Sequence, residues 1–370
     1  MNDKFEVKIE SFAHNGFGVG KLNGKVVFVD FVLPDENVLV EKFFENKDYI
    51  KAHPVKIIEA SRFRVNPKCQ YYGVCGGCDM QHIDYEYQLK LKKRVLVNTL
   101  RRIAKVEIGD VEVVKSKDDF FYRKRASFKC SDKDWGFYKK NSRDFVKIDR
   151  CAIIDENLNR FISSNECIGD GIEVDDFGHI NAKKMLLNLN SIKEGLYIKY
   201  QRGDFTQVNK DVNLSLIETV KSNIMKDDIG SVVEFYGGIG NFSIPLLLEG
   251  LRVANVELNA SSIKSFKNNV KRLGLEDSAF SFRRDLNYNI DIPGNYDCAL
   301  LDPPRTGAKK VVKWILKEKP KFVFYISCEP STLSRDLKNL QNLYKIDFIK
   351  IFDMFPQTHH FETMVKMQLI

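Results

Sequence analysis

The stretch SVVEFYGGIGNFSIPLLLEG, residues 231–250, decides the fold. An apolar run ends in a glycine-rich turn, and a second apolar run with helical spacing follows directly. Glycines at such a turn let the backbone approach a ligand closely, and the start of the helix can face that ligand. The turn therefore predicts a pocket of the nucleotide-binding type, against the alternative that it only packs a helix on a strand.

An acidic residue at the next strand end supports the pocket. Glu257 ends the run RVANVELN, twenty residues after Gly237, where a carboxylate accepts hydrogen bonds from ribose hydroxyls. The spacing Gly-Gly-Ile-Gly-Asn differs from the Gly-x-Gly-x-x-Gly of dinucleotide-binding proteins. We therefore expect S-adenosylmethionine rather than NAD as the ligand.

From about residue 205 onward, apolar strand patterns alternate with helical ones, which predicts a parallel sheet with both faces covered. Asp302 in LLDPPRTG and Cys328 in KFVFYISC each follow such a strand. Both should emerge at the carboxyl end of the sheet, in the crevice where open α/β folds bind ligands. Asp302 could instead be a simple turn former, and Cys328 an inert thiol, as we expect Cys298 to be within its strand.

The segment DMFPQTHHFETM, residues 353–364, offers a proton acceptor for chemistry at Cys328. Glu362 is the candidate base. His359 and His360 are adjacent, and on an extended chain their side chains would point to opposite faces, so we do not expect them to share a metal ion.

The first sixty residues have another pattern. Residues 4–59 hold short alternating runs separated by turn signals, among them Asn23-Gly24, which favours a tight hairpin. This pattern is typical of a small β-barrel of the oligonucleotide-binding type, and the segment resembles a TRAM domain, an RNA-binding barrel.

Cysteine spacing indicates a metal site between these regions. Cys69, Cys75 and Cys78 lie close together in a glycine-rich loop. We expect a cytoplasmic location, where thiols stay reduced, so the eight cysteines should serve as metal ligands or in catalysis rather than in structural disulfides.

Composition points to a polyanionic partner and no membrane. Lysine and arginine number 58 against 50 acids, and no run is long enough to span a bilayer. The segment FYRKRASFK, with Arg123, Lys124 and Arg125 between aromatic residues, would suit phosphate contacts and base stacking; equally, it would suit a strand with one solvated face. The length of 370 residues predicts two or three domains.

Five motifs in this order resemble the RNA uracil-5-methyltransferase family along essentially the whole chain: FTQVN, EFYGGIGNF, LDPPRTG, YISCEPSTLSRDL and DMFPQTHHFETM. The loop CQYYGVCGGC resembles that of the branch with a [4Fe-4S] cluster. The TRAM-like start points to the ribosomal-RNA enzymes, although some transfer-RNA enzymes share it. The resemblance implies a TRAM-like barrel at 1–60, a central α+β domain with the cluster loop at 61–200, and a Rossmann-like methyltransferase domain at 201–370.

The resemblance also implies roles for individual residues. Cys328 matches the nucleophile and Glu362 the base that removes the C5 proton. The S-adenosylmethionine contacts fall on Gln207, Tyr236, Asn241, Glu257, Asp285 and Asp302. Cys151 matches the fourth cluster ligand beside Cys69, Cys75 and Cys78, with Cys130 and Cys167 as possible substitutes and zinc as the competing metal.

The chemistry explains why a thiol is needed. Uracil C5 is too weak a nucleophile for a sulfonium methyl, but addition of the Cys328 thiolate to C6 makes C5 electron-rich. After methyl transfer, Glu362 removes the C5 proton and the thiol leaves, giving 5-methyluridine. The target uridine must be single-stranded or flipped out.

We expect a monomer that acts on 23S ribosomal RNA, with transfer RNA as the alternative substrate. A non-catalytic RNA-binding protein, a redox carrier and an RNA cytosine-5-methyltransferase rank lower.

Overall fold

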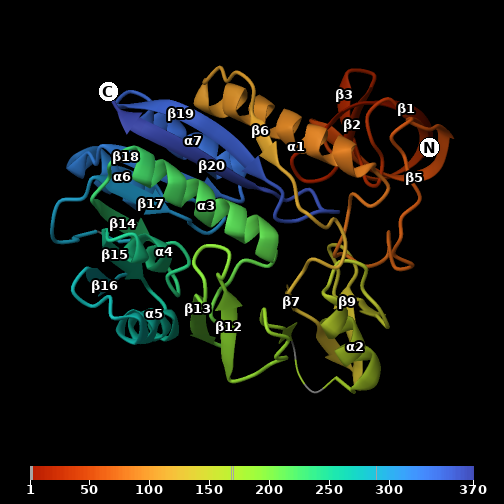
Figure 1. The fold of residues 1–370 in the computed structure, drawn as a ribbon. Helices are drawn as coiled ribbons and strands as arrows, with labels where there is room; N and C mark the ends of the chain where they lie inside the picture. The colour runs from red at the N-terminus through yellow and green to blue at the C-terminus, as the bar shows by residue number, and fades with distance from the viewer. Residues whose placement is uncertain (1–2, 168, 170, 289) are drawn as a thin grey trace.

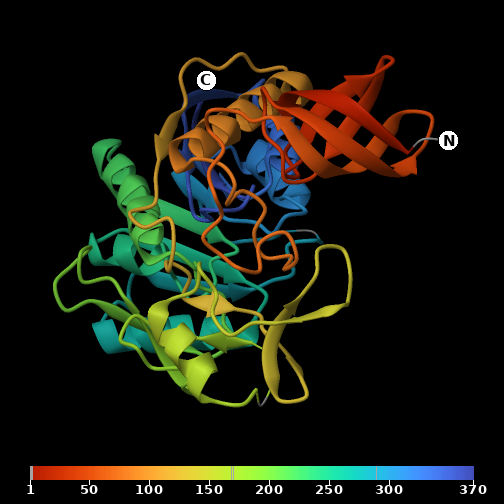
Figure 2. The same ribbon diagram turned by 90° about the vertical axis from the view of Figure 1, so that its right-hand side faces the viewer.

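A computed structural model describes residues 3–167, 169, 171–288 and 290–370. Figure 1 shows three regions: a barrel near the N-terminus, a central region, and a large sheet between helices. Figure 2 shows the barrel standing at one end of the molecule, and in both views helix α1 lies between the barrel and the large sheet.

The barrel is closed, and its strands follow each other in the order β1-β2-β3-β5-β4. Alternate side chains point inward and form a core made largely of valine. Asn23 and Gly24 both have positive φ, 49° and 80°, and make the two-residue turn between β2 and β3, which confirms the hairpin predicted there. The strands are β1 (Lys4–Phe12), β2 (Gly18–Leu22), β3 (Lys25–Val29), β4 (Asn37–Glu45) and β5 (Tyr49–Glu59).

The central region consists of short antiparallel sheets and one helix. Its sheets have the orders β10-β9-β8, β11-β7 and β12-β13. The elements are β7 (Arg125–Ala126), β8 (Lys129–Ser131), β9 (Asp134–Tyr138), β10 (Phe145–Lys147), α2 (Glu156–Ser164), β11 (Ile172–Glu173), β12 (Lys184–Asn188) and β13 (Tyr197–Gln201).

The basic and aromatic segment 121–129 builds this central region. Phe128 is fully buried, and its ring packs on Trp135. Lys124 pairs with Asp155 at 2.9 Å, and Arg125 with Glu173 at 3.2 Å. Lys124 and Arg125 therefore help to hold the central region together, and RNA contact by this segment stays a prediction.

Cys130 and Cys167 form a disulfide. The N–H of Cys167 donates to Lys133 O at 2.7 Å, which holds the segment after α2 against the turn that follows β8 and brings the two Cα atoms within 5.6 Å. The expectation that the chain has no structural disulfide is therefore wrong for this pair. Neither cysteine can substitute as a cluster ligand while it is paired.

The large sheet has eight strands in the order β16-β15-β14-β17-β18-β20-β19-β6. Strands β14 to β18 are mutually parallel, β20 runs antiparallel to both its neighbours, and β6 is parallel to β19. This is the predicted Rossmann-like methyltransferase sheet. Its strands are β6 (Glu112–Val114), β14 (Ser231–Phe235), β15 (Arg252–Glu257), β16 (Ala279–Arg283), β17 (Cys298–Leu301), β18 (Phe322–Ser327), β19 (Tyr344–Phe352) and β20 (Glu362–Leu369).

Helices cover both faces of this sheet, as the alternating pattern predicted (Figure 1). Apolar residues of β14 to β20 pack on either side, so two separate cores result. One face carries α3 (Lys210–Lys226), α4 (Ser243–Leu248) and α5 (Ala260–Leu273); the other carries α1 (Tyr85–Thr99), the π-helical turn η1 (Leu100–Ala104), α6 (Lys309–Glu318) and α7 (Pro330–Leu340).

Helix α1 and strand β6 precede the central region in sequence but belong spatially to the large sheet. Asp84 caps α1 by accepting the N–H of Tyr87, and the helix continues directly into η1. Strand β6 then pairs with the outer edge of β19, with Glu112 opposite Lys350. No helix in the described part of the chain has both the length and the apolar character needed to cross a membrane.

Candidate active site

The glycine turn after β14 has the tight geometry that its sequence predicts. Tyr236, Gly238 and Gly240 have positive φ, and a Cβ on Gly237 would lie 2.3 Å from the Asn255 side chain. Only glycine fits at such a close approach. Tyr236 is a strained residue at the strand end, which is typical of ligand-binding turns.

Glu257 lies beside this turn at the end of β15. Its Oε2 accepts the N–H of Gly238 at 3.0 Å, and its Oε1 accepts those of Leu258 and Asn259 at 2.7 Å each. Three backbone donors therefore fix the carboxylate at the carboxyl ends of two neighbouring strands.

Four of the six residues expected to bind S-adenosylmethionine line one pocket together with the glycine turn. They are Gln207, Tyr236, Asn241 and Asp302. The Nε2 of Gln207 donates to Asp302 Oδ2 at 3.2 Å, and burial raises the pKa of Asp302 to about 6. Asn241 exchanges a reciprocal pair of hydrogen bonds with Asn213 of α3.

The other two expected residues do not line that pocket. Glu257 contacts the turn through the Gly238 N–H. Asp285 follows β16 and accepts the N–H of Asn287 at 2.9 Å, and its charge acts on Tyr236. Glu257 therefore lies at the edge of the pocket, whereas Asp285 is connected to it only through its charge.

Glu234, which no sequence motif had singled out, also lines the pocket. It is the next-to-last residue of β14, is buried, and accepts a hydrogen bond from Ser243 Oγ. Burial raises its pKa to about 8. The signal that could have revealed it is an acid inside an otherwise apolar strand.

Cys328 and Glu362 meet at the end of two paired strands. Ser327 of β18 lies opposite Thr363 of β20 in the antiparallel register, so the next residues along the pair are Cys328 and Glu362. Burial raises the pKa of the Cys328 thiol to about 12, and the carboxylates of Glu362 and Asp302 add to the rise, whereas Arg305 opposes it. The thiol and two acids therefore share one electrostatic environment.

Glu362 is almost completely buried, at 4% exposure. Its Oε2 has no hydrogen-bond partner among the described residues. Burial, followed by the charge of Asp302, raises its pKa well above the usual range, while Arg305 lowers it. A buried carboxyl group with a free oxygen is suited to exchange a proton with a ligand that enters the site.

His359 and His360 lie in the turn before β20 rather than on a strand. Their ring centroids are 3.9 Å apart, so the expectation that they point to opposite faces is wrong. His359 Nδ1 lies 2.5 Å from Asp79 Oδ2, and His360 Nε2 lies 3.2 Å from a guanidinium nitrogen of Arg305.

The four cysteines expected to hold a cluster line a single cavity of about 320 Å³, which also reaches Arg305 and His360. Burial raises the pKa of Cys75 to about 11 and those of Cys78 and Cys151 also above the usual range. In the described ranges, no three or more His, Cys, Asp or Glu side chains are grouped so that they could hold a metal ion. Cys69 is the fourth cysteine of this cavity.

A Rossmann-like sheet, a glycine turn and a carboxylate at the end of the next strand define an α/β methyltransferase. Comparison with known sequences gives the family: the chain belongs to the tRNA (uracil-5-)-methyltransferase family, whose model matches residues 169–369. It is an enzyme of the RNA uracil-5-methyltransferase class. Residues 2–55 match the TRAM domain.

Relatives align along the whole chain. The chain is 30% identical over 430 residues to the 23S rRNA (uracil(1939)-C(5))-methyltransferase RlmD of Shewanella halifaxensis, covering 100% of this chain and 96% of that protein. The corresponding protein of Shewanella amazonensis is 31% identical, with coverages of 100% and 97%. An RNA methyltransferase of Aquifex aeolicus is 29% identical over the full length of both chains.

A solved structure shares the fold. The tRNA (uracil-54, C5)-methyltransferase of Pyrococcus abyssi, in complex with S-adenosyl-L-homocysteine, superposes with a TM-score of 0.75 at 24% identity. The match covers 98% of this chain and 100% of that chain.

Proposed function

We propose that the protein transfers a methyl group from S-adenosylmethionine to C5 of a uridine in 23S ribosomal RNA. The single observation that carries the reaction is the position of Cys328 beside Glu362, on the same sheet edge as the glycine pocket. The ribosomal substrate is supported by the TRAM barrel and by full-length relatives named as 23S rRNA enzymes.

The residues of the pocket fit S-adenosylmethionine. This ligand carries a sulfonium and an ammonium group, and the pocket presents the buried carboxyl group of Glu234 and the half-buried carboxyl group of Asp302. Opposite charge nearby favours the ionised carboxylates, which burial alone disfavours. Gln207, Tyr236 and Asn241 would orient the ligand from the pocket wall, Glu257 from its edge as the ribose acceptor, and Asp285 through its charge. When bound, S-adenosylmethionine supplies an electrophilic methyl group.

Cys328 and Glu362 would perform the steps on uracil. Cys328, once its thiol has lost the proton, bonds as the thiolate to C6, and the electron pair of the C5–C6 double bond moves to C5. After C5 has gained its methyl group, Glu362 takes the C5 proton. The electrons of that C–H bond restore the double bond, and the sulfur leaves C6. The free Oε2 of Glu362 supports its role as the proton acceptor.

We further propose that Cys69, Cys75, Cys78 and Cys151 hold a [4Fe-4S] cluster. All four line one cavity, which supports a shared ligand. A single zinc ion, the competing metal, would need four sulfurs at about 2.3 Å from one point. A four-iron cluster is larger and binds each thiolate at a separate iron. It would tie the loop at 69–78 to Cys151.

We propose that the three parts of the chain have different roles. The barrel at 1–60 would bind RNA, the part at 61–200 would bind the cluster, and the part at 201–370 would transfer the methyl group. The packing of α1 and β6 on the large sheet runs across this division.

Reaction with labelled S-adenosylmethionine tests the function. Transcripts of 23S ribosomal RNA and of transfer RNA are incubated separately with the protein and with Cys328→Ser, and the RNA is digested to nucleosides. We expect 5-methyluridine in 23S transcripts with the unaltered protein only. If 5-methyluridine appears only in transfer RNA, the proposed ribosomal substrate is wrong. If 5-methylcytidine or no product appears, the proposed reaction is wrong.

A further inference from the structure

A short turn of the barrel, residues 13–17 between β1 and β2, contacts the candidate active site. His14 in this turn contacts Glu329, which directly follows Cys328 in sequence. The Nε2 of His14 lies 2.9 Å from Glu329 Oε1 and 3.1 Å from Oε2. The two residues are 315 positions apart in the chain.

Glu329 is held from its other side by the start of helix α7. Its Oε1 accepts the backbone N–H of Ser331 at 3.2 Å and the Ser331 hydroxyl at 2.6 Å. Partial burial raises the pKa of Glu329, but the contact with His14 and then the hydrogen bonds from Ser331 outweigh it and lower the pKa to about 2, so the carboxylate is charged. The peptide that carries Cys328 is therefore fixed between the helix cap and the barrel.

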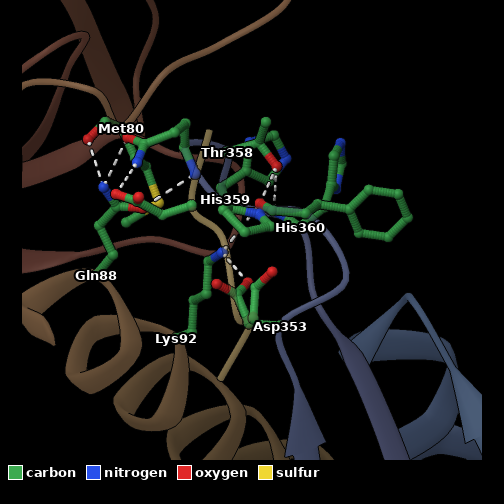
Figure 3. A network of polar contacts seen from close by, with 12 residues as sticks. Met80, Gln88, Lys92, Asp353, Thr358, His359 and His360 are labelled. Atoms are coloured by element: carbon green, nitrogen blue, oxygen red, sulfur yellow. Dashed lines mark hydrogen bonds and ion pairs between the residues drawn. The ribbon is translucent and has the colours of Figure 1, made fainter. Parts of the chain in front are cut away.

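The turn itself is fixed by the loops around it. A Cβ on Gly16 would lie 2.7 Å from Asp79 Oδ2 and 3.2 Å from His359 Nδ1. The rings of His14 and His359 meet edge to face at 6.1 Å. Figure 3 shows His359 among the polar contacts that join the cysteine loop to the segment before Glu362. The turn cannot move without moving these loops.

The other ring nitrogen of His14, Nδ1, lies in an energetically unfavourable environment. Nδ1 is buried and has no hydrogen-bond partner in the described part of the chain, and an unpaired buried polar atom is unfavourable. An apolar residue would avoid this cost but would not bond to Glu329. The contact with Glu329 is thus the interaction that the ring provides.

We propose that His14 is a positioning residue of the methyl-transfer reaction. Through Glu329 it holds the Cys328 segment in place, so the barrel contributes to catalysis as well as to binding RNA. The inference rests on the proposed function, because it takes Cys328 as the reacting thiol. Small displacements of a reacting group are costly, with about 1 Å reducing rates by about a hundredfold.

Three variants test this role. His14→Ala removes the contact, His14→Gln keeps a side-chain N–H that can donate to Glu329, and Asn15→Ala changes an exposed neighbour in the same turn. The readouts are kcat and KM for RNA, and the rate at which iodoacetamide modifies Cys328 in the absence of RNA.

We expect kcat of His14→Ala to fall about tenfold or more, with KM within about twofold. The alkylation rate of Cys328 should change in His14→Ala, and His14→Gln should recover most of both values. Asn15→Ala should behave like the unaltered protein. A raised KM with unchanged kcat, or equal losses in His14→Ala and His14→Gln, would overturn the proposal.

A second pair of measurements covers the case in which His14→Ala does not fold. Glu329→Gln preserves shape and removes the charged partner, so its kcat should fall while its thermal unfolding stays cooperative. An unchanged kcat would contradict the proposal. Alkylation of Cys328 needs no substrate, so it tests positioning even if the methylation assay shows that the proposed function is wrong.

Discussion

Lys92 and Asp353 form an ion pair that is sealed from solvent. The Nζ of Lys92 lies 2.6 Å from Asp353 Oδ1, with the two side chains 1% and 0% exposed (Figure 3). Lys92 also donates to Phe355 O at 3.2 Å, and Tyr85 donates its hydroxyl hydrogen to Asp353 Oδ2 at 2.9 Å. The pair joins helix α1 to the segment that leads to Glu362.

Replacing Lys92 with methionine should strongly destabilise the protein. The change leaves the Asp353 carboxylate buried without a cation, which costs about 3–5 kcal/mol in the free energy of unfolding. Chemical denaturation measures the loss. Lys93→Met is the matched control, because the neighbouring Lys93 pairs with Asp110, whose side chain is 90% exposed, and should change stability by less than about 1 kcal/mol. Equal effects of the two variants would contradict this assignment.

Gly16→Ala should cost more stability than Gly24→Ala. Both glycines have φ near 80°, so alanine meets about 1–2 kcal/mol of backbone strain at either site. At Gly24 the added Cβ meets no atom within 4 Å, whereas at Gly16 it meets Asp79 and His359. Thermal unfolding of the two variants isolates the contact, and a smaller loss for Gly16→Ala would show that the turn is free to shift.

Glu362→Gln should trap the protein on its RNA. If Glu362 removes the C5 proton, its loss stops the reaction after the Cys328–C6 bond has formed, so a covalent complex should accumulate on a denaturing gel. The double variant Cys328→Ser/Glu362→Gln should give no such complex. Release of methylated RNA by Glu362→Gln at an undiminished rate would assign the base to another residue.

The rate at which iodoacetamide alkylates Cys328 should keep rising with pH far above neutrality. Only the thiolate reacts, and the pKa of this thiol is raised to about 12, so the rate should grow about tenfold per pH unit throughout the range where the protein is folded. An ordinary thiol would level off near its pKa of about 8.5. Mass spectrometry of the modified peptide provides the rate, with Cys328→Ser as the blank. A plateau below pH 9 would mean that burial and the carboxylates of Glu362 and Asp302 do not raise the pKa of the thiol.

Substituting a cysteine of the 320 Å³ cavity should abolish cluster binding. In Cys69→Ser, we expect iron and acid-labile sulfide to fall well below the values of the unaltered protein, together with the visible absorption of the cluster. Cys130→Ser is the control, since Cys130 bonds to Cys167 and should retain the cluster. Zinc without sulfide in the purified protein would favour the competing metal.

The parts of the site that the sequence could predict follow from strand order. Cys328 and Asp302 come at strand ends, and the carboxyl ends of parallel strands share one edge of the sheet, so their proximity could be inferred without coordinates. The barrel and the hairpin turn at Asn23-Gly24 follow in the same way from alternation and turn chemistry.

The parts that could not be predicted depend on contacts between distant segments. His14 lies in a loop that looks exposed, and its partner is 315 residues later. The disulfide between Cys130 and Cys167 depends on how the segment after α2 folds back, which spacing does not reveal. His359 and His360 share one side because the chain turns there, and the period of two holds only for a strand.

The pairing of β6 with β19 limits how the chain of this enzyme can be divided into fragments. A fragment that begins at residue 201 would lack the outermost strand of its sheet and helix α1 on one face. The uncovered edge of β19 would then be available to pair with other chains, which favours aggregation. Transplanting the catalytic unit to a different RNA-binding module would therefore require residues 85–114 to travel with it.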